Sequence, residues 1–202
     1  EAGSLASFIA AGTSGSCVDE PMIPFYFFYS MFGFQRVGDL IWAAGDMKTR
    51  GFLIGATAGR TTLNGEGLQH QDGHSLLLAS AYPTVVSYDP AFGFEVAAIV
   101  REGLRRMYQE GEAVIYYLTV YNENVTMPPG EDRFEPGILK GLYPYDEAPD
   151  GDGPPVQLFG SGTILPEALR ARTLLREQFD VRAAVWSATS YQQLRRDALD
   201  AD

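Results

Sequence analysis

The strongest constraint on the fold is an alternation of short apolar segments with segments of helical periodicity. The apolar segments are rich in aromatic and β-branched residues, which favour buried strands. We expect four of them in the first part of the chain, at Ile23–Phe28, Gly51–Ala58, Thr84–Tyr88 and Val114–Tyr121. Between them, apolar residues recur at helical spacing over Met31–Ala44 and Pro90–Tyr108, with Asp89 as N-cap and Pro90 as the first helical residue. The alternation predicts an α/β fold with a mostly parallel sheet and helices on both faces.

An acidic segment rich in glycine and proline, DEAPDGDGPP at residues 146–155, divides the chain and indicates a linker. We therefore expect one domain over residues 1–145. Residues 156–202 hold a further strand, helix and strand, at Val156–Gly160, Pro166–Phe179 and Val181–Ser187. This part is too short to bury a core of its own, so we expect the beginning of a second, truncated α/β domain. The chain starts at Glu1 and stops at Asp202, inside or just after a polar helix, so both ends look cut.

The charge balance excludes several classes of partner. The formal net charge is -11 at pH 7 and the pI is about 4.6. A nucleic-acid-binding protein would carry a basic face, and a protein bound to an anionic membrane surface would carry basic clusters. No uncharged apolar segment is long enough for a membrane helix. Cys17 is the single cysteine, so no internal disulfide is possible, which fits a cytoplasmic protein.

Candidate chemistry is concentrated in the segment GRTTLNGEGLQHQDGHS at residues 59–75. It directly follows a predicted strand and contains four glycines and both histidines of the chain. Ligands of open parallel sheets bind beyond the carboxyl ends of the strands, so a polar loop at that place is a candidate site. Two plainer interpretations stay open: a solvated loop, or a metal site of His70 and His74 that lacks a third histidine or cysteine ligand.

Four segments closely resemble the homodimeric bacterial pyruvate dehydrogenase decarboxylating components, which belong to the transketolase-like enzymes that use thiamine diphosphate. The segments are PMIPFYFFYSMFGFQRVGDLIWAAGD (Pro21–Asp46), GRTTLNGEGLQHQDGHS (Gly59–Ser75), SYDPAFGFEVAAIV (Ser87–Val100) and YYLTVYNENVTMP (Tyr116–Pro128). They follow one another in the family's order. The resemblance covers nearly the whole chain, most loosely after about Asp146.

The resemblance implies a pyrimidine-binding domain over the first part of the chain and the beginning of a transketolase C-terminal-like domain after the linker. It implies thiamine diphosphate as the cofactor, bound with Mg²⁺ between the first domain of one subunit and the second domain of its partner in a homodimer. The implied activity is oxidative decarboxylation of pyruvate, with transfer of the acetyl group to the lipoyl domain of the acetyltransferase component.

The resemblance also assigns roles to five residues. Glu1, in the context Glu-x-Gly, falls on the glutamate that hydrogen-bonds the aminopyrimidine ring and favours the tautomer that acts as a base. Tyr29 and Phe32 fall on aromatic positions around the pyrimidine and the substrate. Glu66 and His70 fall on an acidic and an imidazole active-site position, and His70 can move a proton to or from the substrate. The alternatives are a solvated terminus for Glu1 and core packing for the two aromatic rings.

The family's diphosphate motif has no equivalent that we can recognise in the chain. Gly151-Asp152-Gly153 resembles its beginning, but two prolines follow and no asparagine occurs after Asn124, so we interpret the match as chance. The Mg²⁺ ligands are therefore expected outside this chain, and the chain by itself should be inactive. Two other functions stay open: another thiamine-diphosphate 2-oxo acid dehydrogenase or transketolase relative, and a non-catalytic interaction module.

Overall fold

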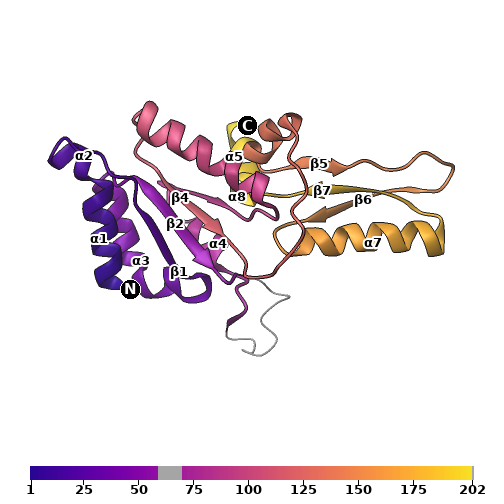
Figure 1. The fold of residues 1–202 in the computed structure, drawn as a ribbon, viewed down its shortest axis with the longest axis horizontal. Helices are drawn as coiled ribbons and strands as arrows, with labels where there is room; N and C mark the ends of the chain where they lie inside the picture. The colour runs from indigo at the N-terminus through magenta and orange to yellow at the C-terminus, as the bar shows by residue number, and fades with distance from the viewer. Residues whose placement is uncertain (59–69, 202) are drawn as a thin grey trace. The chain divides into compact units, whose positions relative to one another are not determined.

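The computed structural model describes residues 1–58 and 70–201. These residues form two compact units (Figure 1). The first unit contains residues 1–88 and 100–124, and the second contains residues 89–99 and 125–202. Among the described helices, none is both long and apolar enough to cross a lipid bilayer.

A parallel sheet of four strands forms the centre of the first unit. The strands, in spatial order, are β1 (Phe25–Tyr29), β2 (Gly51–Ala56), β4 (Ile115–Thr119) and β3 (Val85–Tyr88). Each neighbouring pair is parallel, and β2, β3 and β4 are almost entirely buried. The four expected strands and their parallel arrangement are therefore confirmed.

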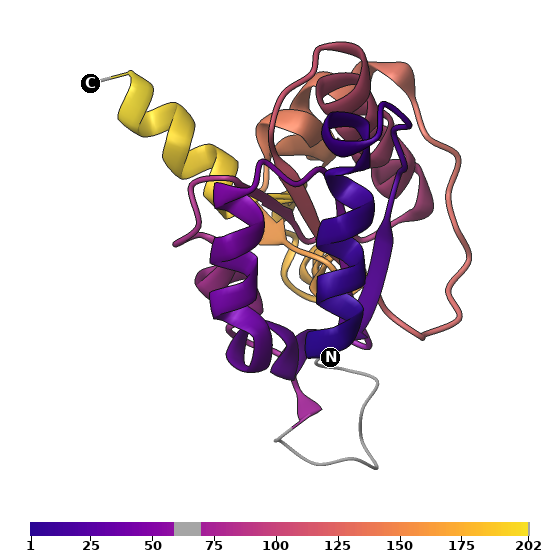
Figure 2. The same cartoon turned by 90° about the vertical axis from the view of Figure 1, so that its left-hand side faces the viewer.

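Helices cover both faces of this sheet, as the alternating pattern predicts. The helices of the first unit are α1 (Ala2–Gly12), α2 (Ser14–Cys17), α3 (Ser30–Asp46), α4 (Ser75–Ala79) and the end of α5 (Gly93–Leu104). Helices α1 and α3 lie side by side (Figures 1 and 2) and bury Leu5 and Ile41 in one core with Leu53 and Tyr117 of the sheet. On the opposite face, α5 comes so close to the sheet that a Cβ at Gly103 would lie 2.7 Å from the ring of Phe52.

Helix α5 begins later than its sequence pattern indicates. Pro90 is not the first helical residue, because α5 starts three residues after it. The buried carboxylate of Glu95 accepts hydrogen bonds from the backbone N–H groups of Ala91 and Phe92. Glu95, rather than the predicted Asp89, therefore satisfies the amides at the start of the helix. The last part of the helical pattern is a π-helical turn, Arg105–Gln109.

A sheet of three strands in the order β5-β7-β6 forms the second unit. Its elements are α6 (Glu135–Lys140), β5 (Tyr143–Asp146), β6 (Pro155–Gly160), α7 (Ile164–Phe179), β7 (Arg182–Ser187) and α8 (Tyr191–Asp200). Strands β6 and β7 are parallel, and β5 pairs with β7 in the antiparallel direction. Helix α7 packs on β6 and β7, with Leu165 and Val185 in the core. The predicted strand, helix and strand are confirmed, although α7 begins two residues earlier than expected, and the sequence pattern did not predict β5.

The segment with the Gly-Asp-Gly tripeptide connects β5 to β6. Gly153 is buried, and a Cβ there would lie 2.0 Å from the carbonyl oxygen of Asp180. Arg182 donates from Nε to the carbonyl oxygen of Pro149 at 2.7 Å. A side chain at position 153 has no room, so this glycine serves the close packing of the loop.

Candidate active site

The carboxyl end of β1 carries two of the candidate residues. Tyr29 ends the strand and, with φ -62° and ψ 119°, is also the N-cap of α3. Phe32 follows in the first turn of that helix, and the two rings lie edge to face with centroids 6.3 Å apart. Tyr29 is 45% exposed and Phe32 is half-buried. Both rings therefore keep surface that a ligand can contact.

His70 lies against both of these rings. Its ring centroid is 5.7 Å from that of Tyr29 and 5.5 Å from that of Phe32, and its plane is nearly perpendicular to Phe32, at 87°. The structure thus brings the imidazole of His70 against two aromatic rings that lie far from it in the sequence. Glu66, the remaining candidate of the glycine-rich loop predicted at residues 59–75, lies outside the described residues.

Glu1 reaches the same cluster through an arginine that the sequence analysis missed. Nη1 of Arg36 lies 3.1 Å from Oε1 and 3.3 Å from Oε2 of Glu1. The guanidinium carbon of Arg36 also lies 4.4 Å from the ring centroid of Phe32, a cation–π distance. Arg36 follows Phe32 by four residues on the same helix, so its position on that face could have been deduced from the helical period.

Glu1 also lies close to a tyrosine of β1, Tyr26. The hydroxyl of Tyr26 donates to the carbonyl oxygen of Glu1 at 3.4 Å. Burial, and secondly the negative charge of Glu1, raise the pKa of Tyr26 above its usual value. The hydroxyl of Tyr26 therefore stays protonated at neutral pH and remains a hydrogen-bond donor beside Glu1.

The end of the loop, just after His70, is attached to helix α3 by His74. Its Nε2 lies 2.6 Å from Nε2 of Gln35 and 3.2 Å from the carbonyl oxygen of Met31. Asp72 is 3% exposed, and its Oδ1 accepts a hydrogen bond from the backbone N–H of His74 at 3.1 Å. The sequence analysis gave Asp72 no role, although an aspartate shortly before a helical segment is a known capping signal.

The side chains of this cluster have the chemistry to meet an aromatic, nitrogen-containing ring. Glu1 supplies a carboxylate acceptor, Tyr29 and Phe32 supply apolar ring surface, and His70 supplies a group that can carry a proton. No group of three His, Cys, Asp or Glu side chains placed to hold a metal ion occurs within residues 1–58 and 70–201. The residues present fit the aminopyrimidine half of thiamine diphosphate, whereas a Mg²⁺-diphosphate group would need ligands that this set does not contain.

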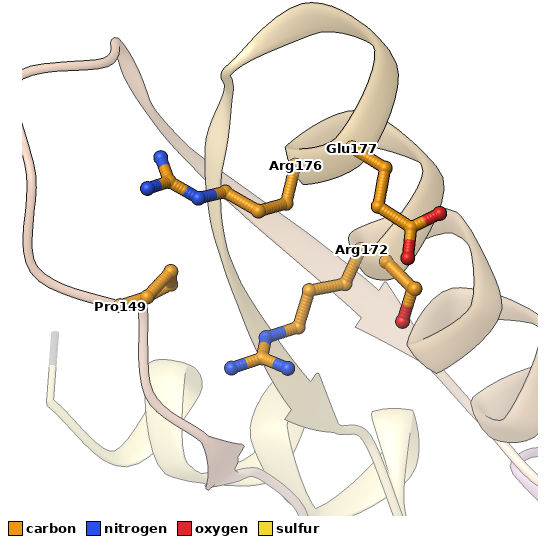
Figure 3. Close-up of a pocket in the computed structure, with 5 residues that line it drawn as sticks. Pro149, Arg172, Arg176 and Glu177 are labelled. Carbon is orange, nitrogen blue, oxygen red and sulfur yellow. The ribbon is translucent and has the colours of Figure 1, made fainter.

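A separate hollow lies on the second unit and contains none of the candidate residues. It has a volume of about 240 Å³ and is lined by Pro149, Arg172, Thr173, Arg176 and Glu177. Figure 3 shows both guanidinium groups extending from α7 towards Pro149. Nη1 of Arg172 lies 3.0 Å from Asp146 Oδ2, and Nη1 of Arg176 lies 2.6 Å from Asp180 Oδ1. Both guanidinium groups that line the hollow therefore already pair with carboxylates.

Comparison with protein families identifies two domains in the chain. Residues 1–128 match the family described as the pyruvate dehydrogenase E1 component middle domain. Residues 141–201 match the family described as the transketolase-like C-terminal domain. The candidate residues Glu1, Tyr29, Phe32, Glu66 and His70 all lie within the first match.

Curated relatives named pyruvate dehydrogenase E1 component align with nearly the whole chain. The protein from Pseudomonas aeruginosa is 57% identical over 199 residues, which is 98% of this chain and 23% of the relative. The protein from Mycobacterium tuberculosis is 56% identical over 98% of this chain and 22% of the relative. The protein from Escherichia coli K12 is 52% identical over 100% of this chain and 23% of the relative. This chain therefore spans less than a quarter of the length of these relatives.

Solved structures of transketolases share the fold at low sequence identity. A transketolase from Pichia stipitis matches with a TM-score of 0.66 and 16% identity, over 85% of this chain and 24% of that one. A transketolase from Campylobacter jejuni matches with a TM-score of 0.62 and 18% identity, over 87% of this chain and 26% of that one. These solved structures show a shared fold. The family matches show that the chain belongs to the pyruvate dehydrogenase E1 component family, of which it carries the middle domain and a C-terminal-domain segment.

Proposed function

We propose that this chain is the pyrimidine-binding part of a pyruvate dehydrogenase decarboxylating component that uses thiamine diphosphate. The proposed reaction is oxidative decarboxylation of pyruvate with transfer of the acetyl group to the lipoyl domain of an acetyltransferase component. The observation that carries the proposal is the cluster at the carboxyl end of β1, where Tyr29, Phe32 and His70 lie in contact. Arg36 links Glu1 to the same cluster. The names of the relatives support the same reading.

Each residue has a role that follows from its chemistry. The carboxyl group of Glu1 holds a proton at a ring nitrogen of the aminopyrimidine, and Arg36 orients that carboxyl group. Phe32 stacks on the pyrimidine ring, and Tyr29 offers its hydroxyl as a hydrogen-bond donor to the bound substrate. His70 donates a hydrogen bond or a proton to an oxygen of pyruvate. Glu66, by the family resemblance, tunes or orients neighbouring groups. Thiamine diphosphate, when bound, supplies the nucleophilic carbon and the electron sink for decarboxylation.

Mg²⁺ and the diphosphate would bind residues outside this chain, and the other side of the cofactor would be contributed by the partner in a homodimer. The proposal also includes a pyrimidine-binding domain at residues 1–145, a linker at 146–155, a C-terminal-like domain at 156–202 and a cytoplasmic location.

The test is the substitution His70→Ala in the full-length enzyme, assayed for pyruvate turnover with a lipoyl acceptor. Loss of a group that moves a proton should lower kcat by about 10²- to 10⁴-fold. Leu77→Ala is the matched control, because Leu77 is 73% exposed in the neighbouring α4. Unchanged turnover in His70→Ala would overturn the catalytic role of the loop and favour a non-catalytic module. Assays of the unsubstituted enzyme with larger 2-oxo acids separate pyruvate from other substrates of the same class.

A further inference from the structure

A buried series of hydrogen-bonded side chains connects the end of the glycine-rich loop to the central strand β4. Oδ1 of Asp72 accepts hydrogen bonds from the backbone N–H groups of His74, at 3.1 Å, and Ser75, at 2.9 Å. Its Oδ2 accepts a hydrogen bond from the hydroxyl of Ser75. Ser75 Oγ in turn accepts a hydrogen bond from the hydroxyl of Tyr117 at 2.8 Å. The three side chains thus form one continuous line from loop to sheet.

The three hydrogen-bonded side chains are buried, so water cannot compete for their hydrogen bonds. Asp72 is 3% exposed, Ser75 is 1% exposed and Tyr117 is fully buried. The ring of Tyr117 is fixed by two neighbours, since it stacks on Phe28 with centroids 5.8 Å apart and meets Phe34 edge-on at 4.8 Å. A hydrogen bond to a carboxylate is stronger than one between neutral groups, and more so in a buried site. Asp72 is therefore connected through Ser75 to a fully buried tyrosine of the central strand β4.

We propose that Asp72, Ser75 and Tyr117 are positioning residues that hold His70 in place against Tyr29 and Phe32. His70 lies two residues before Asp72, so the place where the chain returns to the sheet also determines where the imidazole lies. His74 adds a second attachment, to Met31 and Gln35 at the start of α3. This inference rests on the proposed function, because positioning His70 affects turnover only if His70 takes part in the reaction.

A role in positioning the loop and a role in general packing predict different results when a single buried hydroxyl is removed. Tyr117→Phe removes the hydroxyl that bonds Ser75 and keeps the ring that packs on Phe28 and Phe34. The matched control is Tyr116→Phe. Tyr116 is the adjacent residue of the same strand, is equally buried, and its hydroxyl accepts a hydrogen bond from Arg106 at 3.1 Å. The control thus removes a buried hydroxyl from β4 without touching the loop.

The experiment uses the full-length enzyme with its cofactor and two readouts. Hydrogen–deuterium exchange over residues 70–79 should become faster in Tyr117→Phe and stay unchanged in Tyr116→Phe, because Asp72 protects the amides of His74 and Ser75. Steady-state kinetics should show kcat lowered by about tenfold to 100-fold in Tyr117→Phe, with a smaller change in the KM for pyruvate, as expected for misplacement of a catalytic group by about 1 Å.

Two results would overturn the inference. One is exchange over residues 70–79 that does not differ between the two variants, and the other is a kcat that falls equally in both. Ser75→Ala removes the hydroxyl that links Asp72 to Tyr117 and should repeat the effect of Tyr117→Phe. It replaces Tyr117→Phe in the experiment if that variant does not fold. His70→Ala keeps the two proposals apart. If His70→Ala retains full turnover, the proposed function fails, whereas a loss in His70→Ala with normal Tyr117→Phe defeats only the positioning role.

Discussion

At the scale of single residues, Arg36 joins two of the candidate groups. It pairs with Glu1 and covers one face of Phe32. The pair is partly exposed, with 54% of the Arg36 side chain and 29% of the Glu1 side chain accessible, so water screens much of its energy. Its main contribution is therefore the orientation of the Glu1 carboxylate rather than the stability of the fold.

Arg36→Ala should weaken the binding of thiamine diphosphate to the full-length enzyme by up to about fivefold, because a partly exposed ion pair is worth up to about 1 kcal/mol. Isothermal titration calorimetry with Mg²⁺ present measures the change in Kd. Arg170→Ala serves as the control, since Arg170 forms a comparable exposed pair with Glu167. Equal Kd values for the two variants would argue against any role of Arg36 at the pyrimidine.

At the scale of elements, Glu95 determines where α5 begins and also binds two strands of the second unit. It is completely buried, and its Oε1 accepts hydrogen bonds from the hydroxyls of Tyr143 in β5 and Ser187 in β7, both at 2.6 Å. Burial, and secondly the charge of Glu95, raise the pKa of Tyr143 above its usual value, so its hydroxyl stays a donor. The carboxylate of Glu95 thus caps helix α5 and hydrogen-bonds side chains of both β5 and β7.

Glu95→Ala should lower the free energy of unfolding by about 3 kcal/mol or more, because each buried donor left without its acceptor costs about 1–3 kcal/mol. Urea unfolding followed by circular dichroism measures the loss. Glu167→Ala is the control, because Glu167 is a first-turn acid of α7 that pairs only at the exposed surface, and its loss should cost less than about 1 kcal/mol. A similar small loss in both variants would contradict the structural role of Glu95.

At the scale of the whole molecule, β1 carries an apolar surface that the described residues leave open. It is an edge strand of its sheet, with Phe25 46% and Phe27 62% exposed. Met22 and Ile23, just before the strand, are also exposed. Aromatic side chains of this size at a sheet edge are unusual on a surface that meets only water.

The isolated 202-residue chain should therefore self-associate. Sedimentation velocity over a range of protein concentrations should show species larger than the 22.1 kDa monomer. Phe27→Lys should shift the distribution towards monomer, because a charge on an edge strand opposes pairing. Phe179→Lys, which changes an exposed phenylalanine at the end of α7, is the control. A monomer at all concentrations would count against this prediction.

Hydrophobic pattern alone predicted most of the sheet and the order of the elements. Strands β2 and β4 are buried along their length, so their residues form continuous apolar runs that local sequence reveals. The start of α5 was mispredicted because the carboxylate of Asp89 accepts a hydrogen bond from the hydroxyl of Ser161, a residue 72 positions away, while Glu95 takes the amides at the helix start. Strand β5 was missed because its four residues contain a proline and an aspartate, and only its pairing with β7 makes it a strand.

The sequence by itself determined the fold class, the family and the chemical identity of the candidate residues, because these depend on residue types and their order along the chain. Only the tertiary structure decided which of those residues meet. It placed His70 against Tyr29 and Phe32, paired Glu1 with Arg36, and connected Asp72 to Tyr117 through Ser75. Such contacts join residues separated by up to about forty positions. They depend on the register of the sheet and the packing of α1 and α3, which no local pattern contains.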